Sequence, residues 1–238
     1  MRFLDSLTER QEKLALAAFA AAAYGLYWPL SWLTASLPGH HPELAIDRAT
    51  PLLPGAVWVY ALVWAAGALP LAVPTSRALF RRVVGAYLVV IAVAYSVFLA
   101  YPVHMALRPA PPVAESISTW GLAMVYTFDK PSNCLPSLHV AVAMLAGLSV
   151  WSADRLVGLA GVAVAFAIAA STMLVKQHYF LDAASGALLA WIAWRLCIRP
   201  LGDVRLPPDR RGLLWMTAAQ GVFFASMTGL YLSGYVPG

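Results

Sequence analysis

The hydropathy pattern of the chain consists of seven long apolar runs separated by shorter polar stretches. A helix of roughly 20 apolar residues is long enough to cross the hydrocarbon core of a bilayer. The runs are too long and too uniformly apolar for the alternating strands of a membrane barrel. We therefore expect an all-α integral membrane protein, with membrane helices near residues 14–37, 52–74, 83–106, 137–152, 156–175, 178–197 and 212–235.

The runs suggest one compact helical unit followed by an addition. We expect residues 1–199 to form a six-helix transmembrane core, and residues 200–238 to supply an inner linker and a seventh span. The longest connection, 107–136, starts with a proline-rich segment that favours extended backbone. Residues 113–128 are apolar on one side, which is typical of an interfacial helix. This helix is expected either to line a lateral entrance or to cover the bundle as a lid.

Composition and charge placement agree with a membrane protein of defined orientation. Of the 238 residues, 61% are hydrophobic and 11% are charged, whereas soluble domains carry about 25% charged residues. Twelve of the sixteen lysines and arginines fall on the side of the N-terminus, which predicts that this side is cytoplasmic. This topology largely explains the basic pI of about 9.4, so no nucleic-acid partner is indicated. The opposite, outer side holds all five histidines and only Arg48, Arg108, Lys130 and Lys176.

A histidine and an aspartate stand at the start of the sixth run. His178 and Asp182 are four positions apart, which on a helix places them on one face. The carboxylate can then hold one ring nitrogen as N–H and leave the other free to act as a nucleophile. The alternative is an ordinary capping pair at the membrane interface.

A second histidine stands at the start of the fourth run. Pro136 suits the first turn of a helix, and the free backbone N–H groups there, together with the Ser137 hydroxyl, favour binding of an anion. His139 is then placed to donate a proton to a leaving oxygen. The alternative is an N-cap serine beside an interfacial histidine.

Basic residues on the same side complete this candidate site. Arg108 and Lys176 are expected to bind a phosphate and stabilise its transition state. Lys130 is a weaker candidate, because contact with lipid headgroups also explains it. A zinc site at His139, His178 and Asp182 is disfavoured because the chain has no His-Glu-x-x-His motif and no cysteine pair. Ser137 also lacks the Gly-x-Ser-x-Gly setting of an acyl-transfer nucleophile.

These motifs resemble those of the type 2 phosphatidic acid phosphatase (PAP2) superfamily, in the branch that includes inositol phosphorylceramide synthases. The second motif of that branch, Pro-Ser-Leu-His, corresponds to Pro136 to His139. The end of the third motif, His-x-x-x-Asp, corresponds to His178 to Asp182, and the Arg-Pro end of the first motif corresponds to Arg108-Pro109.

Two positions depart from the family pattern. The lysine expected seven positions before Arg108 is Tyr101, and the Ser-Arg start of the third motif is Ser171-Thr172. We expect Lys176 to substitute for the missing arginine.

The resemblance implies a covalent mechanism without a metal or another cofactor. His178 would attack phosphorus, Asp182 would orient His178, and His139 would protonate the leaving group and later activate the acceptor. The expected substrate is a lipid phosphate or diphosphate, hydrolysed at the periplasmic or extracellular face of the plasma membrane.

Other functions stay open at this point. One alternative is transfer of the phospho group to an alcohol on another lipid, as in inositol phosphorylceramide synthases. A non-catalytic transporter or scaffold is a third, although the spans carry no ionisable residue at mid-depth. The lipid headgroup, the chain type and the oligomeric state are not indicated by the sequence.

Overall fold

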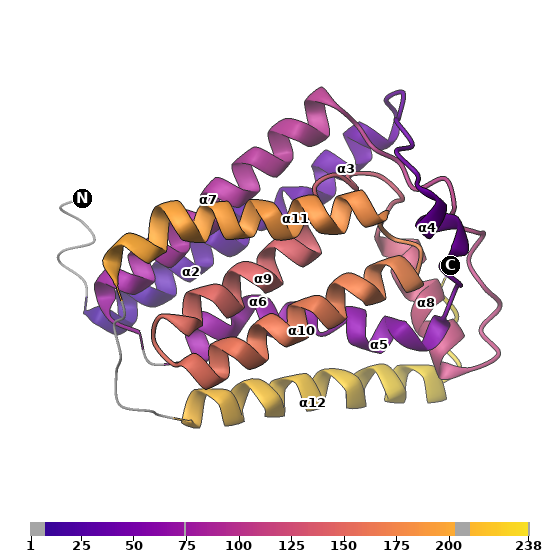
Figure 1. Ribbon diagram of the computed structural model, residues 1–238. Helices are drawn as coiled ribbons and strands as arrows, with labels where there is room; N and C mark the ends of the chain where they lie inside the picture. The colour runs from indigo at the N-terminus through magenta and orange to yellow at the C-terminus, as the bar shows by residue number, and fades with distance from the viewer. Residues whose placement is uncertain (1–7, 74, 203–209, 238) are drawn as a thin grey trace.

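The computed structural model describes residues 8–73, 75–202 and 210–237, and the described part of the chain is a bundle of helices (Figure 1). Six helical segments are long and apolar enough to cross a membrane, and α9 is a shorter apolar helix. The all-α membrane fold expected from the sequence is thereby confirmed. The elements in chain order are α2 (Glu9–Gly25), α3 (Tyr27–Ala35), α4 (Ala45–Ala49), η1 (Pro54–Ala56), α5 (Val57–Tyr60), α6 (Val63–Ala72), α7 (Arg77–Ala100), α8 (Ile117–Phe128), α9 (Leu138–Trp151), α10 (Arg155–Leu174), α11 (Phe180–Ala193), η2 (Trp194–Ile198), η3 (Arg199–Leu201) and α12 (Arg211–Leu232).

All seven predicted apolar runs are helical. The first run forms α2 and α3, and the second forms η1, α5 and α6. The predicted interfacial helix is α8, which packs against α5, η1 and α12. Most of the predicted inner linker, residues 203–209, lies outside the described residues.

The third run was placed about six residues too late. Helix α7 begins at Arg77, after the side chain of Ser76 accepts a hydrogen bond from the Leu79 N–H. The first turn of α7 is basic, but Arg77 and Arg81 form ion pairs with Glu12, a buried residue of α2. Opposite charges therefore allow the helix to continue into this polar end.

The shortest membrane helix, α9, is the centre of the bundle. It packs against α6, α7, α10 and α11, and twelve of its fourteen residues are buried. The added helix α12 lies along the outside of α6 and α8 and has no buried residue. A helix enclosed by other helices needs less length than one that faces lipid along its full span, which explains why the fourth run is short.

Two glycines allow α9 and α10 to pack closely. A methyl group added at Gly147 of α9 would lie 2.6 Å from the backbone nitrogen of Val162, and one added at Gly161 of α10 would lie 2.9 Å from the Gly147 Cα. Small residues at such crossings let membrane helices approach one another. This contact fixes α9 laterally in the bundle.

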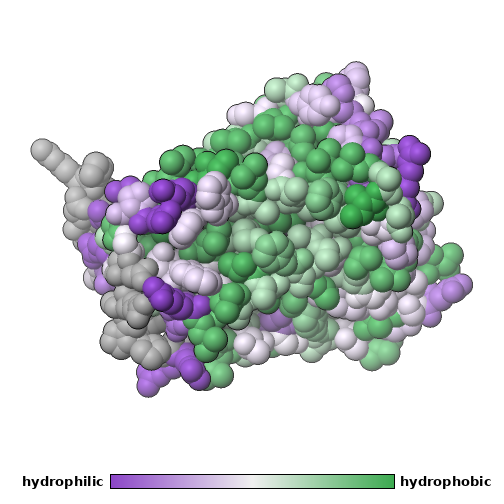
Figure 2. All heavy atoms as spheres, in the orientation of Figure 1, coloured by the Kyte–Doolittle hydropathy of each residue, from purple (hydrophilic) through white to green (hydrophobic). Residues whose placement is uncertain are grey.

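Most basic residues lie at the end of the bundle opposite the candidate site residues. In Figure 1, the starts of α2, α7 and α12 lie at one end, whereas α4 and α8 lie at the other. Figure 2 shows hydrophobic side chains across the middle of this face and hydrophilic ones toward its two ends. This distribution fits a protein that crosses a membrane along the bundle axis.

We predict that Gly147→Ala destabilises the protein by about 1–3 kcal/mol, because the added methyl group overpacks the α9–α10 crossing. Gly85→Ala in α7 is the matched control, since a Cβ at that position meets nothing within 4 Å. Thermal unfolding in detergent measures both variants. Equal midpoints for the two variants would contradict the close crossing.

Candidate active site

His139 is held at the start of α9. Ser137 is the N-cap residue, and its hydroxyl oxygen accepts a hydrogen bond from the Val140 N–H at 3.4 Å. His139 is the second residue of the helix and is 7% exposed. The capping serine therefore fixes the first turn, which carries the histidine.

His178 lies in the connection between α10 and α11, two residues before α11 begins. Its backbone N–H donates to the Thr172 carbonyl oxygen at 3.2 Å. Asp182 is fully buried, and its Oδ2 accepts a hydrogen bond from the Tyr179 N–H at 2.8 Å. The same oxygen lies 3.5 Å from His178 Nδ1. Asp182 thus caps α11 and lies beside the imidazole, but His178 precedes the helix and its Nδ1 has no hydrogen-bond partner, so the hydrogen bond expected from the four-residue spacing is not formed.

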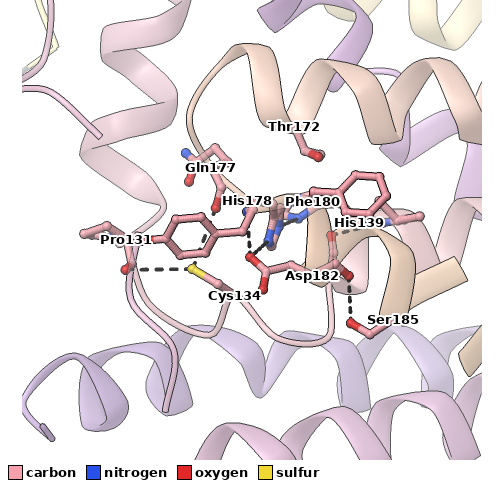
Figure 3. Close-up of polar contacts among 12 residues, drawn as sticks. Pro131, Cys134, His139, Thr172, Gln177, His178, Phe180, Asp182 and Ser185 are labelled. Carbon is pink, nitrogen blue, oxygen red and sulfur yellow. Dashed lines mark hydrogen bonds and ion pairs between the residues drawn. The ribbon is translucent and has the colours of Figure 1, made fainter. Parts of the chain in front are cut away.

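The two histidines meet where α9 and α11 converge. His139 Nδ1 lies 3.2 Å from His178 Nε2, and both rings are buried (Figure 3). The Ser137 N–H donates to the Asp182 carbonyl oxygen at 2.9 Å. A methyl group at Gly186 of α11 would overlap with the Ser137 carbonyl oxygen. Glycine at this position lets the two helix starts touch, and this contact brings the rings together.

Sequence reasoning missed a second carboxylate beside His139. Asp129, which follows α8, accepts hydrogen bonds from the Tyr60 hydroxyl at 2.9 Å and from the Tyr27 hydroxyl at 2.8 Å. The Tyr60 oxygen also lies 2.7 Å from His139 Nε2. The only signal in the sequence was an acidic residue on the outer side next to Lys130, and nothing local links it to tyrosines in two other helices.

Arg108 is brought to the edge of the histidine pair. Its guanidinium donates to the carbonyl oxygens of Tyr126 and Asp129 at 2.5 and 2.7 Å, and to Gln177 Oε1 at 3.3 Å. It also lies 3.9 Å over the Tyr126 ring. Burial lowers the pKa of Arg108, but a guanidinium stays protonated in proteins. A fixed positive charge therefore lies next to the residue that precedes His178.

Lys176 does not take the position expected of a substitute for the missing arginine. Its ammonium group donates to the carbonyl oxygens of Asp47 and Thr50 at 2.9 and 2.6 Å. The Asp47 carboxylate in turn accepts the Phe180 N–H at 2.7 Å. Lys176 has a φ of 52°, an uncommon value for a residue with a side chain. The lysine therefore ties the turn before His178 to the loop around α4.

Lys130 and the Thr172 hydroxyl make their contacts away from the histidine pair. Lys130 is exposed and lines a separate groove with Trp28, Trp32 and Phe128. Thr172, at the position of the missing arginine, is buried, and its hydroxyl donates to the Ala169 carbonyl oxygen at 2.7 Å. The structure thus groups Arg108 and Ser137 with the histidines and leaves both lysines in contacts elsewhere.

A cysteine that the sequence argument set aside lies next to His178. Cys134, His178 and Asp182 have potential ligand atoms within 4.8 Å of one another (Figure 3). Burial raises the pKa of the Cys134 thiol well above its usual value, and the Asp182 and Asp129 carboxylates add to this effect. The sulfur is therefore a neutral thiol beside the imidazole.

An apolar cavity reaches His139 from the side of α6 and α8. Its volume is about 180 Å³, and Tyr60, Asp129 and His139 form its polar end. Its remaining walls are mainly aromatic and include Phe223 of α12. A second apolar cavity of about 340 Å³, between α2, α6 and α7, shares Tyr24, Trp28 and Trp64 with the first. An apolar ligand can therefore extend from His139 toward the exposed side chains of Trp28 and Trp64.

The histidine pair, its carboxylate and the membrane bundle agree with a comparison to known families. Residues 31–196 match the PAP2 superfamily, and this segment is more than half of the chain. The chain therefore belongs to the PAP2 superfamily, whose members are generally phosphatases or phosphotransferases. No curated protein and no solved structure matches the chain.

We predict that Lys176→Met lowers the midpoint of thermal unfolding by several degrees. The carbonyl oxygens of Asp47 and Thr50 lose their donor, and the turn before His178 loses its hydrogen bonds to the loop around α4. Lys130→Met is the matched control and should leave the midpoint unchanged, since this lysine is exposed. A Lys176→Met protein as stable as the wild type would show that the side chain is free to bind a ligand instead.

Proposed function

We propose that this protein is a membrane phosphatase that hydrolyses a lipid phosphomonoester or diphosphate through a phosphohistidine at the outer membrane face. The observation that carries the proposal is the buried contact between His178 Nε2 and His139 Nδ1 at 3.2 Å, with Asp182 behind His178. One nitrogen is placed to attack, and its neighbour is placed to move a proton.

The first step forms the covalent intermediate. The lone pair on His178 Nε2 attacks phosphorus, while the bond from phosphorus to the leaving oxygen breaks. His139 donates its Nδ1 proton to that oxygen, which leaves as an alcohol or as a phosphate. The phosphoryl group enters where the contact between the two rings opens. Asp182 stabilises the positive charge that develops on His178.

The second step releases the product. Neutral His139 takes a proton from water, and the resulting hydroxide oxygen attacks phosphorus as the bond to His178 Nε2 breaks. Inorganic phosphate leaves and His139 is again protonated. Both steps use only side chains of this chain, which is consistent with the expectation of no metal and no cofactor.

Charge on the transferring phosphoryl group requires fixed donors. Arg108 lies at the edge of the site, and the first turn of α9 presents backbone N–H groups beside Ser137. Such groups stabilise anions without reorganisation during the reaction. Phosphate binding by Lys176 or Lys130 remains a prediction, and Lys176 would have to leave the two carbonyl oxygens that it binds.

The apolar cavities support a lipid as the substrate. The polar end of the 180 Å³ cavity is at His139, and aromatic side chains cover the rest. A leaving group protonated by His139 would therefore lie with its chain in this cavity. The outer location follows from the clustering of basic residues at the opposite end of the bundle, together with the positive-inside rule.

Transfer to an alcohol is the second candidate function. An apolar cavity that ends at His139 can also hold a lipid whose hydroxyl group replaces water in the second step. This would place the protein with the inositol phosphorylceramide synthases that its Pro-Ser-Leu-His sequence resembles. The covalent first step is the same in both cases.

We predict metal-independent turnover of at least one lipid phosphate or diphosphate by the purified protein in detergent with EDTA. His178→Ala should abolish turnover, and Asp182→Asn should lower it by about 10²-fold through misorientation of the ring. His41→Ala is the matched control, because this exposed histidine lies on the same side but outside the site. Thin-layer separation of radiolabelled products measures each variant, with and without alcohol lipids.

The products distinguish the functions. Inorganic phosphate from the wild type but not from His178→Ala supports the phosphatase, whereas a new phospholipid formed only with an added alcohol lipid supports the transferase. Equal product from the wild type and His178→Ala would refute the nucleophile. No product from any lipid would instead favour a transporter or scaffold.

A further inference from the structure

A chain of polar contacts extends from His139 away from the proposed nucleophile. Tyr60, at the end of α5, contacts both His139 Nε2 and Asp129 Oδ2, and Tyr27 of α3 contacts Asp129 Oδ1. Tyr60 is 5% exposed and Tyr27 is 8% exposed. These contacts join four separate segments of the chain around one carboxylate, and the chemistry described so far does not use them.

The direction of each hydrogen bond in this series, from Asp129 through Tyr60 to His139, follows from the groups at its two ends. An ionised carboxylate only accepts hydrogen bonds, so both tyrosine hydroxyls donate to Asp129. The single proton of the Tyr60 hydroxyl is then directed at Asp129, and its oxygen offers a lone pair to His139. In this arrangement His139 Nε2 carries a proton and donates it to the Tyr60 oxygen at 2.7 Å.

The other nitrogen of His139 is constrained by the nucleophile. His178 Nε2 must be unprotonated to attack, so the 3.2 Å contact requires a proton on His139 Nδ1. With protons on both nitrogens, His139 would be an imidazolium ion, the form that a general acid needs, and burial of the ring opposes this charge. Asp129 Oδ2 lies 3.9 Å from His139 Nε2, close enough to stabilise this charge.

We propose that Tyr60 and Asp129 are positioning residues that hold His139 as the protonated acid, an inference that rests on the proposed function. During the first step the Nδ1 proton moves to the leaving oxygen, while the Nε2 proton stays on the ring and faces Tyr60. In the second step Nδ1 recovers a proton from water or an alcohol. Tyr60 and Asp129 exchange no proton with the substrate.

The arrangement places each carboxylate behind a different ring. Asp182 faces His178, and Asp129 faces His139 through Tyr60. Arg108 donates to the Asp129 carbonyl oxygen, which keeps a positive charge near this second carboxylate. A negative charge close to a phosphate site is otherwise repulsive, so positive charge nearby, on Arg108 and on protonated His139, explains why Asp129 is tolerated there.

Dependence on the leaving group tests the proposal. A 4-nitrophenolate ion departs with little protonation, whereas an alkoxide requires a general acid. We compare kcat/KM for 4-nitrophenyl phosphate with kcat/KM for decyl phosphate. The parameter kcat/KM reports only the steps up to the first irreversible one, which here is the departure of the leaving group. Tyr60→Phe should lower kcat/KM for decyl phosphate by about 10- to 100-fold, part of what a general acid contributes, and should change the value for 4-nitrophenyl phosphate by less than about threefold.

Tyr95→Phe is the matched control, because it removes a tyrosine hydroxyl that donates only to the backbone carbonyl oxygens of Ala23 and Tyr24, outside the site. It should have little effect on either substrate. Asp129→Asn should show the same selective loss as Tyr60→Phe and serves as the second variant if Tyr60→Phe does not fold. Thermal unfolding checks that each variant is intact.

The outcomes separate this inference from the proposed function. Equal losses on both substrates, or wild-type values for Tyr60→Phe, would refute the positioning role while His178→Ala remains inactive. If the wild type cleaves neither these probes nor any lipid phosphate, the proposed function fails and the inference fails with it.

Discussion

The contact between the start of α9 and the start of α11 determines the geometry of the candidate site. The Ser137 backbone N–H bonds to the Asp182 carbonyl oxygen, and Gly186 leaves room for the Ser137 carbonyl group. Because His139 follows Ser137 by two residues and His178 precedes α11 by two, this one contact brings the two imidazoles within hydrogen-bonding distance. Three other features support this contact between the helix starts: the close crossing at Gly147 and Gly161, the N-cap at Ser137, and the hydrogen bonds from Lys176 to the loop around α4. The site is thus positioned by backbone contacts, which tolerate little displacement.

The environment of the two rings differs in a way that suits different tasks. His178 lies against a fully buried carboxylate and a neutral thiol, away from solvent. His139 faces a hydroxyl, a partly exposed carboxylate and an apolar cavity. A nucleophile gains from a fixed orientation, whereas a proton donor needs access to the leaving group. The structure therefore supports the assignment of these two roles from the surroundings of each ring.

Hydropathy predicted all seven apolar helices because burial in lipid requires long apolar runs. It misplaced mainly the start of α7, where ion pairs with Glu12 extend the helix into a basic segment. The His178–Asp182 and Ser137–His139 pairs were predictable because they are local in sequence and depend on helix starts. Asp129 and Tyr60 were not, since they are 69 residues apart and meet only through the packing of α5 and α8. The role expected of Lys176 was inferred from its charge and its position two residues before His178, but backbone carbonyl groups nearby compete for its ammonium.

The central claim is that His178 Nε2 forms a bond to phosphorus while His139 faces the leaving oxygen. An experimental structure with orthovanadate, which adopts the five-coordinate geometry of a transferring phosphoryl group, tests this most directly. We predict vanadium bound to His178 Nε2, with an apical oxygen toward His139 and equatorial oxygens near Arg108 and the first turn of α9. Vanadate bound at Lys130, bound through His139, or held without a bond to His178 would contradict the account.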